Sequence, residues 1–224
     1  MCGRYTLISD RCAVARLLAL DDVPELFPRY NVAPTQPVLA VRQGAAKREA
    51  VALRWGLIPS WSKDGKAPLI NARSETVADK PAFRSAFRKR RCLVPADGFY
   101  EWQALPGRKQ PFLFRRPDGT PFAIAGLWEH WAGPDGRPLE TCALLTTEAN
   151  AEVRPVHDRM PVLLGVADFD RWLVPDAPLA NLLPLLRPAS DDALAALAVG
   201  PYVNSARHEG PRCVEPPGGP PLSG

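Results

Sequence analysis

Proline is the feature of this sequence that most constrains its fold. The chain has 26 prolines among 224 residues, about twice the usual ~5% share. A proline inside a helix or a central strand removes a backbone donor, so we expect short elements joined by many loops. The shares of hydrophobic and charged residues, 46% and 23%, are typical of folded proteins. The length favours one domain over residues 1–215, and the Pro/Gly-rich tail 216–224 is expected to be disordered.

The spacing of apolar residues predicts short strands with helices at the periphery. Apolar runs bounded by turn residues predict strands over 38–41, 51–58, 67–70, 92–95, 98–102, 111–116, 121–128 and 142–147. Apolar residues at helical spacing predict helices over 11–20, 81–91, 168–173 and 191–198. Tight turns between the strands favour antiparallel pairing, and no β-α-β alternation is present. We therefore expect an α+β fold around an antiparallel sheet or barrel.

Cysteine and histidine spacing argues against a metal site. The five cysteines are scattered without a C-x-x-C pair, and the three histidines lack H-x-x-x-H spacing. We expect no metal, no cofactor and no disulfide framework. No apolar run approaches the ~18 to 20 residues that cross a bilayer, and the first residues lack the apolar stretch of a signal peptide. These features predict a cytoplasmic protein without a membrane partner.

The first residues carry an unusual nucleophile. The chain begins Met1-Cys2-Gly3, and removal of the initiator methionine leaves Cys2 with a thiol and an α-amine. The amine condenses with an aldehyde to an imine, and the thiol then closes a thiazolidine ring that resists hydrolysis. An α-amine titrates near ~7.7 to 8.0 and a lysine near ~10.4, so the terminus forms imines far more readily at neutral pH. The alternative is that a cysteine stands at position two by chance.

Three segments place polar side chains among apolar strand residues: 71–76, 98–102 and 156–162. Glu101 lies between two aromatic residues, where burial raises a carboxyl pKa and allows proton transfer near neutrality. His157 has an intrinsic pKa that suits acid–base chemistry. Both residues also have a structural interpretation, because a strand carboxylate is more often exposed and a single core histidine is more often structural.

Positive charge is carried mainly by arginine and is concentrated in one segment. The net charge is +4, and residues 72–91 alone contain seven Lys or Arg against two Asp or Glu. Arginine binds phosphate with a planar fork and stacks on flat rings, which favours a nucleic-acid surface that includes Arg84 and Arg88. A solvated helix face is the alternative for these two residues, and abundant arginine also occurs where a genome is rich in G and C.

Seven motifs, in order, carry a resemblance to a known family. They are CGRYTL, RYNVAPTQ, WGLIPSW, INARSET, CLVPADGFYEW, LLTTEAN and VHDRMPV. The sequence resembles the SOS-response-associated peptidase (SRAP) family over nearly the whole chain, so residues 1–215 are expected to form one SRAP domain. The resemblance implies an antiparallel β-barrel-like core with flanking short helices. It also implies a sensor that shields abasic sites in single-stranded DNA.

The resemblance implies roles for individual residues. Cys2 attacks the aldehyde of the abasic site, Asn71 orients the N-terminus, and Glu101 and His157 transfer protons. The predicted DNA surface consists of Arg4, Arg73 and Arg159 as phosphate ligands, Trp61 as a wedge or stacking platform, and Thr146, Arg84 and Arg88. We expect a monomer that crosslinks to single-stranded DNA in a single turnover and that associates with the nucleoid when it is bound to damaged DNA.

Two other functions stay open at the level of the sequence. The first is a thiol peptidase or amidase, with Cys2 as N-terminal nucleophile, His157 as base and Glu101 as the residue that orients it. Removal of Met1 by the chain itself is a single-turnover form of that chemistry. The second is a noncovalent single-strand-binding module in which Cys2 is incidental.

Overall fold

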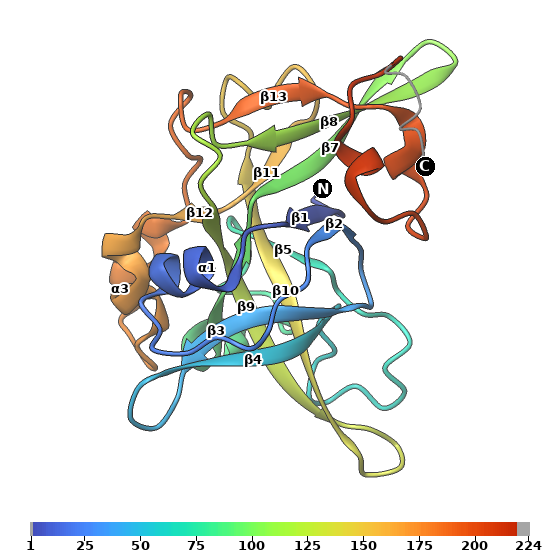
Figure 1. The fold of residues 1–224 in the computed structure, drawn as a ribbon. Helices are drawn as coiled ribbons and strands as arrows, with labels where there is room; N and C mark the ends of the chain where they lie inside the picture. The colour runs from blue at the N-terminus through green and yellow to red at the C-terminus, as the bar shows by residue number, and fades with distance from the viewer. Residues whose placement is uncertain (1, 219–224) are drawn as a thin grey trace.

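Five strands form a closed barrel at the centre of the molecule. The structure is a computed structural model that describes residues 2–218. The barrel strands are β3 (Pro37–Gln43), β4 (Arg48–Trp55), β6 (Arg91–Ala96), β9 (Phe122–Ala132) and β10 (Pro138–Glu148). They pair in the order β10-β4-β3-β6-β9 and back to β10, and Figure 1 shows β3 and β4 crossing in front of β9 and β10. The predicted α+β fold with a barrel-like core is confirmed.

One pairing in the barrel is not antiparallel. β10 runs parallel to β4, with Thr141 opposite Arg54 and Cys142 opposite Trp55, whereas the other four pairings of the ring are antiparallel. The sequence predicts antiparallel pairing from its tight turns. A turn determines only the pairing of the two strands that it joins, and β4 and β10 are far apart in the chain.

A second sheet, antiparallel throughout, stands above the barrel in the view of Figure 1. Its strands are β1 (Tyr5–Leu7), β2 (Arg29–Val32), β7 (Gly98–Leu105), β8 (Arg108–Arg115) and β13 (Ala195–Ala198), in the order β13-β8-β7-β1-β2. β7 and β8 form a hairpin along their full length. β1 pairs only with the first two residues of β7, Gly98 and Phe99. Within the described residues, the rest of this edge of β7 has no paired strand. The N-terminal residues and the C-terminal part of the chain lie next to it.

Three short strands pair with barrel strands outside the closed ring: β5 (Asn71–Arg73), β11 (Arg159–Pro161) and β12 (Leu163–Leu164). β5 pairs in parallel with β10, with Arg73 opposite Thr146. β11 pairs antiparallel to β10, with Pro161 opposite Thr146. The end of β10 thus brings together two segments that are more than eighty residues apart in the sequence.

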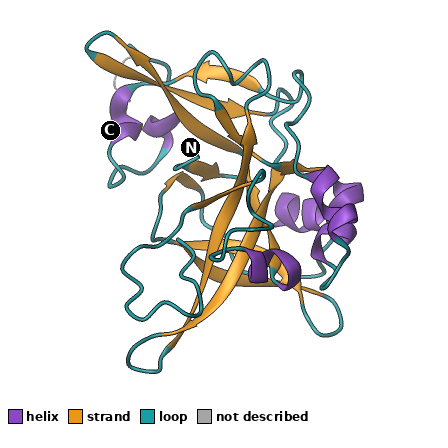
Figure 2. Cartoon of the chain, turned by 180° about the vertical axis from the view of Figure 1, so that it is seen from behind, coloured by secondary structure: helices purple, strands orange, loops and turns teal. Residues whose placement is uncertain are grey.

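The helices are short and lie at the flanks. They are α1 (Arg11–Leu18), α2 (Arg84–Lys89), α3 (Phe169–Leu173) and α4 (Leu179–Leu182), with 3-10 turns at Val166–Asp168, Leu183–Leu185, Pro201–Asn204 and Pro211–Val214. Figure 2 shows most helices on one side of the strands and the two C-terminal 3-10 turns on the other. The Asp10 carboxylate caps α1 by accepting from the backbone N–H of Ala13 at 2.8 Å. No described helix is long and apolar enough to span a membrane.

Two predicted elements are wrong. The helix predicted over 191–198 is instead the strand β13, which pairs with β8 from Ala195 opposite Arg115 to Ala198 opposite Phe112. An alanine-rich run this short cannot maintain a helix alone, and the unpaired edge of β8 offers it backbone partners. The strand predicted over 67–70 is reduced to one bridge between Leu57 and Leu69, and the strand that follows begins at Asn71.

Other boundaries differ from the prediction by a few residues. The helix predicted over 81–91 covers only Arg84–Lys89, because Arg91 begins β6 and its buried guanidinium donates to backbone carbonyls at the ends of α2 and α3. The first helix ends at Leu18, where Ala19 adopts a left-handed conformation. The predicted tail begins within the described part, where Pro217 and Gly218 form a turn, and residues 219–224 lie outside it.

Candidate functional site

The four residues predicted to carry chemistry come from four separate parts of the fold. Cys2 precedes β1, Asn71 begins β5, Glu101 lies in β7, and His157 follows β10 in a loop that leads to β11. The Asn71 amide donates to the carbonyl oxygen of Cys2 at 2.9 Å. The Nε2 atom of His157 lies 3.9 Å from Oε2 of Glu101. The structure therefore joins them as two contacting pairs.

A pocket contains the Glu101–His157 pair together with Gly3, the residue that follows Cys2. It lies along the open edge of β7 and has a volume of about 570 Å³. The backbone N–H of Tyr100 donates to the carbonyl oxygen of Arg4 at 3.0 Å, which aligns the N-terminal residues with this edge. The lining residues are Gly3, Arg4, Glu101, Trp102, Lys109, His157 and Asn204. The residue after Cys2 thus faces the same space as Glu101 and His157.

Burial changes the proton affinity of Glu101 and of the Cys2 thiol. Glu101 is only 3% exposed, and burial raises its pKa to about 7. Burial likewise raises the pKa of the Cys2 thiol well above its ordinary range. The Cys2 thiol therefore stays protonated near neutral pH, whereas Glu101 is present in both its protonated and its ionised form and can exchange a proton there.

The ring of His157 is oriented by the backbone. Its Nδ1 atom accepts from the N–H of Arg159 at 3.0 Å, so the neutral ring carries its proton on Nε2, the nitrogen that faces Glu101. The Asp158 carboxylate lies 3.0 Å from the same Nδ1 atom. Burial nevertheless lowers the pKa of His157, which favours the neutral ring.

Arg4 is the one predicted DNA contact that lines the pocket. Its Nη1 atom donates to Oδ1 of Asn31 at 2.8 Å and to the carbonyl oxygen of Val203 at 3.0 Å, and Nη2 lies 3.4 Å from the carbonyl oxygen of Asn204. These acceptors are neutral, and within residues 2–218 no carboxylate forms an ion pair with Arg4. The guanidinium therefore keeps an uncompensated positive charge at the pocket wall.

Arg159 and Thr146 lie in a different environment. The Arg159 guanidinium pairs with both oxygens of Glu75, at 2.5 and 2.9 Å, and also donates to the carbonyl oxygen of Thr146 at 2.7 Å. Thr146 is fully buried, and its hydroxyl has no hydrogen-bond partner among the described residues. In this conformation the hydroxyl is not accessible to DNA, because the whole residue is buried.

The remaining predicted DNA contacts are exposed but lie outside the pocket. Trp61 is 67% exposed in the loop between β4 and β5, and Arg73 is exposed on β5. Arg84 and Arg88 are exposed on α2, which packs against β6 and β9. Within the described residues none of these three arginines forms an ion pair, so their charges are open to an anionic partner.

Three pocket residues were missed by the sequence reasoning. Trp102 lies in the same sequence motif as Glu101. Side chains alternate between the two faces of a strand, so the sequence predicts that Trp102 and Glu101 point to opposite faces of β7. Lys109 reaches the pocket only through the hairpin that pairs β8 with β7. Asn204 lies more than a hundred residues from Trp102, and no local pattern in the sequence indicates their contact.

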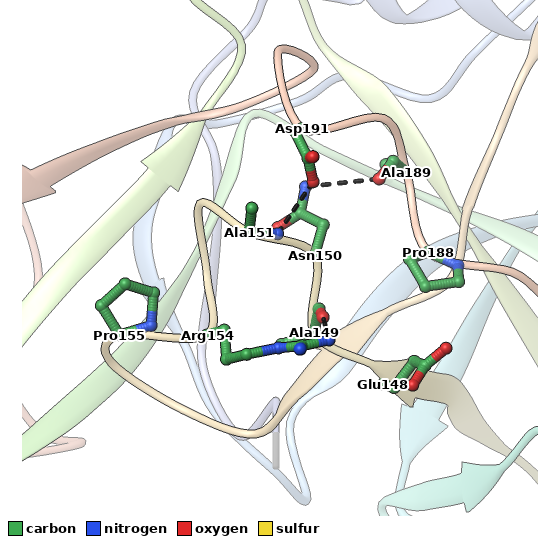
Figure 3. Close-up of a pocket in the computed structure, with 9 residues that line it drawn as sticks. All are labelled: Glu148, Ala149, Asn150, Ala151, Arg154, Pro155, Pro188, Ala189 and Asp191. Carbon is green, nitrogen blue, oxygen red and sulfur yellow. Dashed lines mark hydrogen bonds between the residues drawn. The ribbon is translucent and has the colours of Figure 1, made fainter.

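A larger hollow of about 640 Å³ lies beside the loop that leads to His157 and is drawn in Figure 3. Its polar groups bind one another. The Asn150 amide donates to the carbonyl oxygens of Ala189 and Ser190 at 3.3 and 3.0 Å, and the N–H of Ala151 donates to Asp191 at 2.8 Å. We interpret these hydrogen bonds as contacts that hold the loop in place. The described residues contain no group of three His, Cys, Asp or Glu that is arranged to bind a metal.

Comparisons with known proteins agree over nearly the whole chain. The model of the family "SOS response associated peptidase (SRAP)" matches residues 1–206. The chain is 40% identical to Abasic site processing protein YoqW of Bacillus subtilis, over 96% of this chain and 99% of that protein. It is 32% identical to Abasic site processing protein HMCES of Gallus gallus, over 96% of this chain and 78% of that protein.

Solved structures share the fold. A crystal structure from Bordetella bronchiseptica is similar with a TM-score of 0.77 and 30% identity, over 89% of this chain and all of that one. A structure from Bacteroides thetaiotaomicron has a TM-score of 0.82 over 96% of this chain and 99% of that one, and at 23% identity it supports the fold alone. From the matched family model and the 40% identity over nearly its full length, the chain belongs to the SOS response associated peptidase (SRAP) family.

Proposed function

We propose that the chain, after loss of Met1, captures abasic sites in single-stranded DNA through a covalent bond to Cys2. One observation carries this proposal. The residue next to Cys2 lines the same pocket as a buried carboxyl group with a pKa of about 7 and a histidine whose Nδ1 accepts from the backbone. The relatives that are named abasic site processing proteins support the choice of substrate.

The reaction proceeds in two bond-forming steps. The α-amine of Cys2 adds to the aldehyde carbon of the ring-opened sugar and water leaves, which gives an imine. The thiol then adds to the imine carbon, its proton passes to the nitrogen, and a thiazolidine ring closes. Neither step requires an oxidant, a metal or another co-reactant.

The contacts assign a task to each side chain. Asn71 fixes the carbonyl of Cys2 and thereby limits the directions in which the amine can point. Glu101, when ionised, accepts a proton from the α-amine. His157 presents Nε2–H to the sugar ring oxygen and assists the opening that exposes the aldehyde. Each proton transfer of this kind typically contributes ~10² to 10⁴-fold in rate.

The pocket wall and the exposed surface supply the DNA contacts. Arg4 offers an uncompensated charge to a phosphate, and Lys109 adds a second cation to the same lining. Trp61 offers an exposed aromatic face outside the pocket. Stacking on an aromatic face requires unpaired bases and no particular sequence, which favours a single-stranded partner.

A thiol peptidase is the second candidate, and the family description gives it its basis. A cysteine peptidase attacks with a thiolate, which is most abundant where the thiol pKa is lowered. Burial instead raises the pKa of the Cys2 thiol. Amine-first capture of an aldehyde does not need a thiolate in its first step, so the electrostatics favour capture over peptide hydrolysis.

The proposal is tested with Cys2→Ser in protein whose first residue is confirmed by mass. This variant keeps the α-amine and loses the thiol, so its adduct with abasic single-stranded DNA is expected only after borohydride reduction. The wild-type adduct is expected to withstand heat without reductant. A heat-stable adduct of Cys2→Ser without borohydride contradicts the thiazolidine.

A further inference from the structure

The C-terminal strap, residues 201–214, contributes Asn204 to the wall of the pocket. Its two 3-10 turns are Pro201–Asn204 and Pro211–Val214. Val203 and Cys213 of the strap pack with Tyr100 and Leu113 of the second sheet in a small hydrophobic cluster, separate from the main core. The strap is thus held against β7 and β8 by its own apolar contacts, independently of any ligand.

Asn31 ties the strap to the N-terminal residues. This side chain is 1% exposed, and its amide donates to the carbonyl oxygens of Ser205 and His208, both at 2.9 Å. Its Oδ1 atom accepts from Arg4 at 2.8 Å. A buried amide with all of these partners fixes the strap relative to the pocket, because breaking one bond leaves a buried polar group unpaired.

Two pocket side chains end on a single strap residue. The indole Nε1–H of Trp102 donates to Oδ1 of Asn204 at 2.7 Å, and Nη2 of Arg4 lies 3.4 Å from the Asn204 carbonyl oxygen. The Arg4 guanidinium carbon lies 5.9 Å from the centre of the Trp102 ring. The Arg4 guanidinium therefore lies over the Trp102 ring at the pocket wall, and Asn204 contacts both side chains.

We propose that Asn204 is a positioning residue that orients Trp102, beneath Arg4, to receive the nucleotide adjoining the lesion, with the phosphate at the guanidinium and the base at the part of the ring that Arg4 leaves uncovered. This inference rests on the proposed function, and it adds a residue that acts on DNA through Trp102. A half-buried indole whose N–H has a partner keeps one rotamer. Without Asn204 the ring samples other rotamers, and binding has to order it again.

Binding is measured separately from covalent capture. The probe is a fluorescent single-stranded oligonucleotide that carries one tetrahydrofuran, an abasic analogue without an aldehyde, and its anisotropy reports affinity alone. Asn204→Ala is expected to weaken binding roughly three- to tenfold, a fraction of the effect of losing one stacked base. Ser205→Ala, a neighbouring change in the same strap, is the matched control and should bind as the wild type does.

A double-mutant cycle with Trp102→Phe isolates the positioning role, because phenylalanine keeps an aromatic face and lacks the N–H. In the Trp102→Phe background, Asn204→Ala is expected to change affinity by less than about twofold. An equal loss in both backgrounds overturns the inference. Asn204→Asp keeps an acceptor for the indole, so the Trp102 N–H resonance, identified by its absence in Trp102→Phe, should stay at the wild-type position. A resonance shifted as in Asn204→Ala also overturns it.

Covalent capture of a true abasic strand completes the test. For Asn204→Ala the half-saturating DNA concentration should rise and the limiting rate should stay within about twofold of the wild type. A lowered limiting rate with unchanged half-saturation contradicts a positioning role. If the wild type forms no adduct at all, the proposed covalent function fails. Coupling between Asn204 and Trp102 in the anisotropy measurements would then still support the positioning role of Asn204.

Discussion

Arg4 and Arg159 are both implied to bind DNA phosphates, yet the structure surrounds them differently. Arg4 donates only to neutral amide and carbonyl oxygens. Arg159 forms a two-pronged ion pair with Glu75. One guanidinium keeps its charge for a ligand, and the charge of the other is compensated within the protein.

The difference shows that the partners of an arginine, more than its presence in a motif, decide what it contributes. Arg159 connects β11 to the Glu75 segment, and its backbone N–H sets the proton position on His157. Arg4 lines the pocket wall. We therefore expect changes around Arg159 to alter the rate of capture and changes at Arg4 to alter the affinity for DNA.

The largest expected effect is on the rate of covalent capture. Glu101→Gln should lower the limiting rate of capture by roughly 10²-fold or more, without weakening binding to the tetrahydrofuran strand. Because burial raises the pKa of Glu101 to about 7, the proposed base is protonated below that pH and ionised above it. The wild-type rate should therefore rise with pH through about 7, and single-turnover rates at saturating DNA measure this.

The control for that change is Glu148→Gln, an exposed glutamate at the end of β10. It should leave both the rate and its pH dependence as in the wild type. An unchanged pH profile in Glu101→Gln removes Glu101 from the role of base.

The next effect concerns His157. His157→Ala should slow capture of abasic DNA by about tenfold or more, and it should slow capture of a simple open-chain aldehyde much less, because only the sugar has a ring to open. Rates with both substrates, followed by intact mass, test this. Equal slowing of the two reactions eliminates the ring-opening role.

A smaller effect separates the two arginines directly. Arg4→Ala should weaken binding to the tetrahydrofuran strand and reduce the slope of log affinity against log salt by about 0.7, the value for one phosphate contact on single-stranded DNA. Arg159→Ala should change that slope less and should lower the rate, since β11, which follows His157, loses its side-chain contacts with Glu75 and Thr146. Anisotropy titrations at several salt concentrations compare them. Equal salt slopes for the two variants contradict the claim that Arg4, and not Arg159, has charge available for a phosphate.

The smallest effect comes from Glu75→Gln. This change removes the compensating carboxylate, so Arg159 gains charge that a phosphate can use, and binding should tighten by about two- to threefold with a steeper salt slope. Glu25→Gln, at an exposed glutamate outside the described ion pairs, is the matched control. Weaker binding in Glu75→Gln means that the ion pair positions Arg159 for DNA.

Local patterns predicted much of the fold. The strands over 92–95, 98–102 and 142–147 and the first helix lie close to where their hydrophobic spacing places them, because these segments meet the core with one regular face. The strand β13 was missed, since its residues favour a helix locally and only the edge of β8 makes them extended. Tertiary hydrogen bonds outweighed propensity there.

The site was predictable only where a motif carries it. Cys2, Asn71, Glu101 and His157 were all proposed from segments of the sequence; Glu101 and His157 line one pocket, and Asn71 contacts Cys2, whose neighbour Gly3 lines the same pocket. The partner of Trp102 on the C-terminal strap and the Glu75 ion pair of Arg159 depend on long-range contacts. Pattern and composition contain no information about such contacts.

The most direct test of covalent capture is denaturing gel electrophoresis of Met1-processed protein with single-stranded DNA that carries one abasic site. Cys2→Ala and an undamaged strand of the same sequence are the controls. We predict a heat-stable shifted band only for the wild type with the damaged strand. A band of equal intensity with Cys2→Ala, or no band with protein whose first residue is shown to be Cys2, contradicts capture through Cys2.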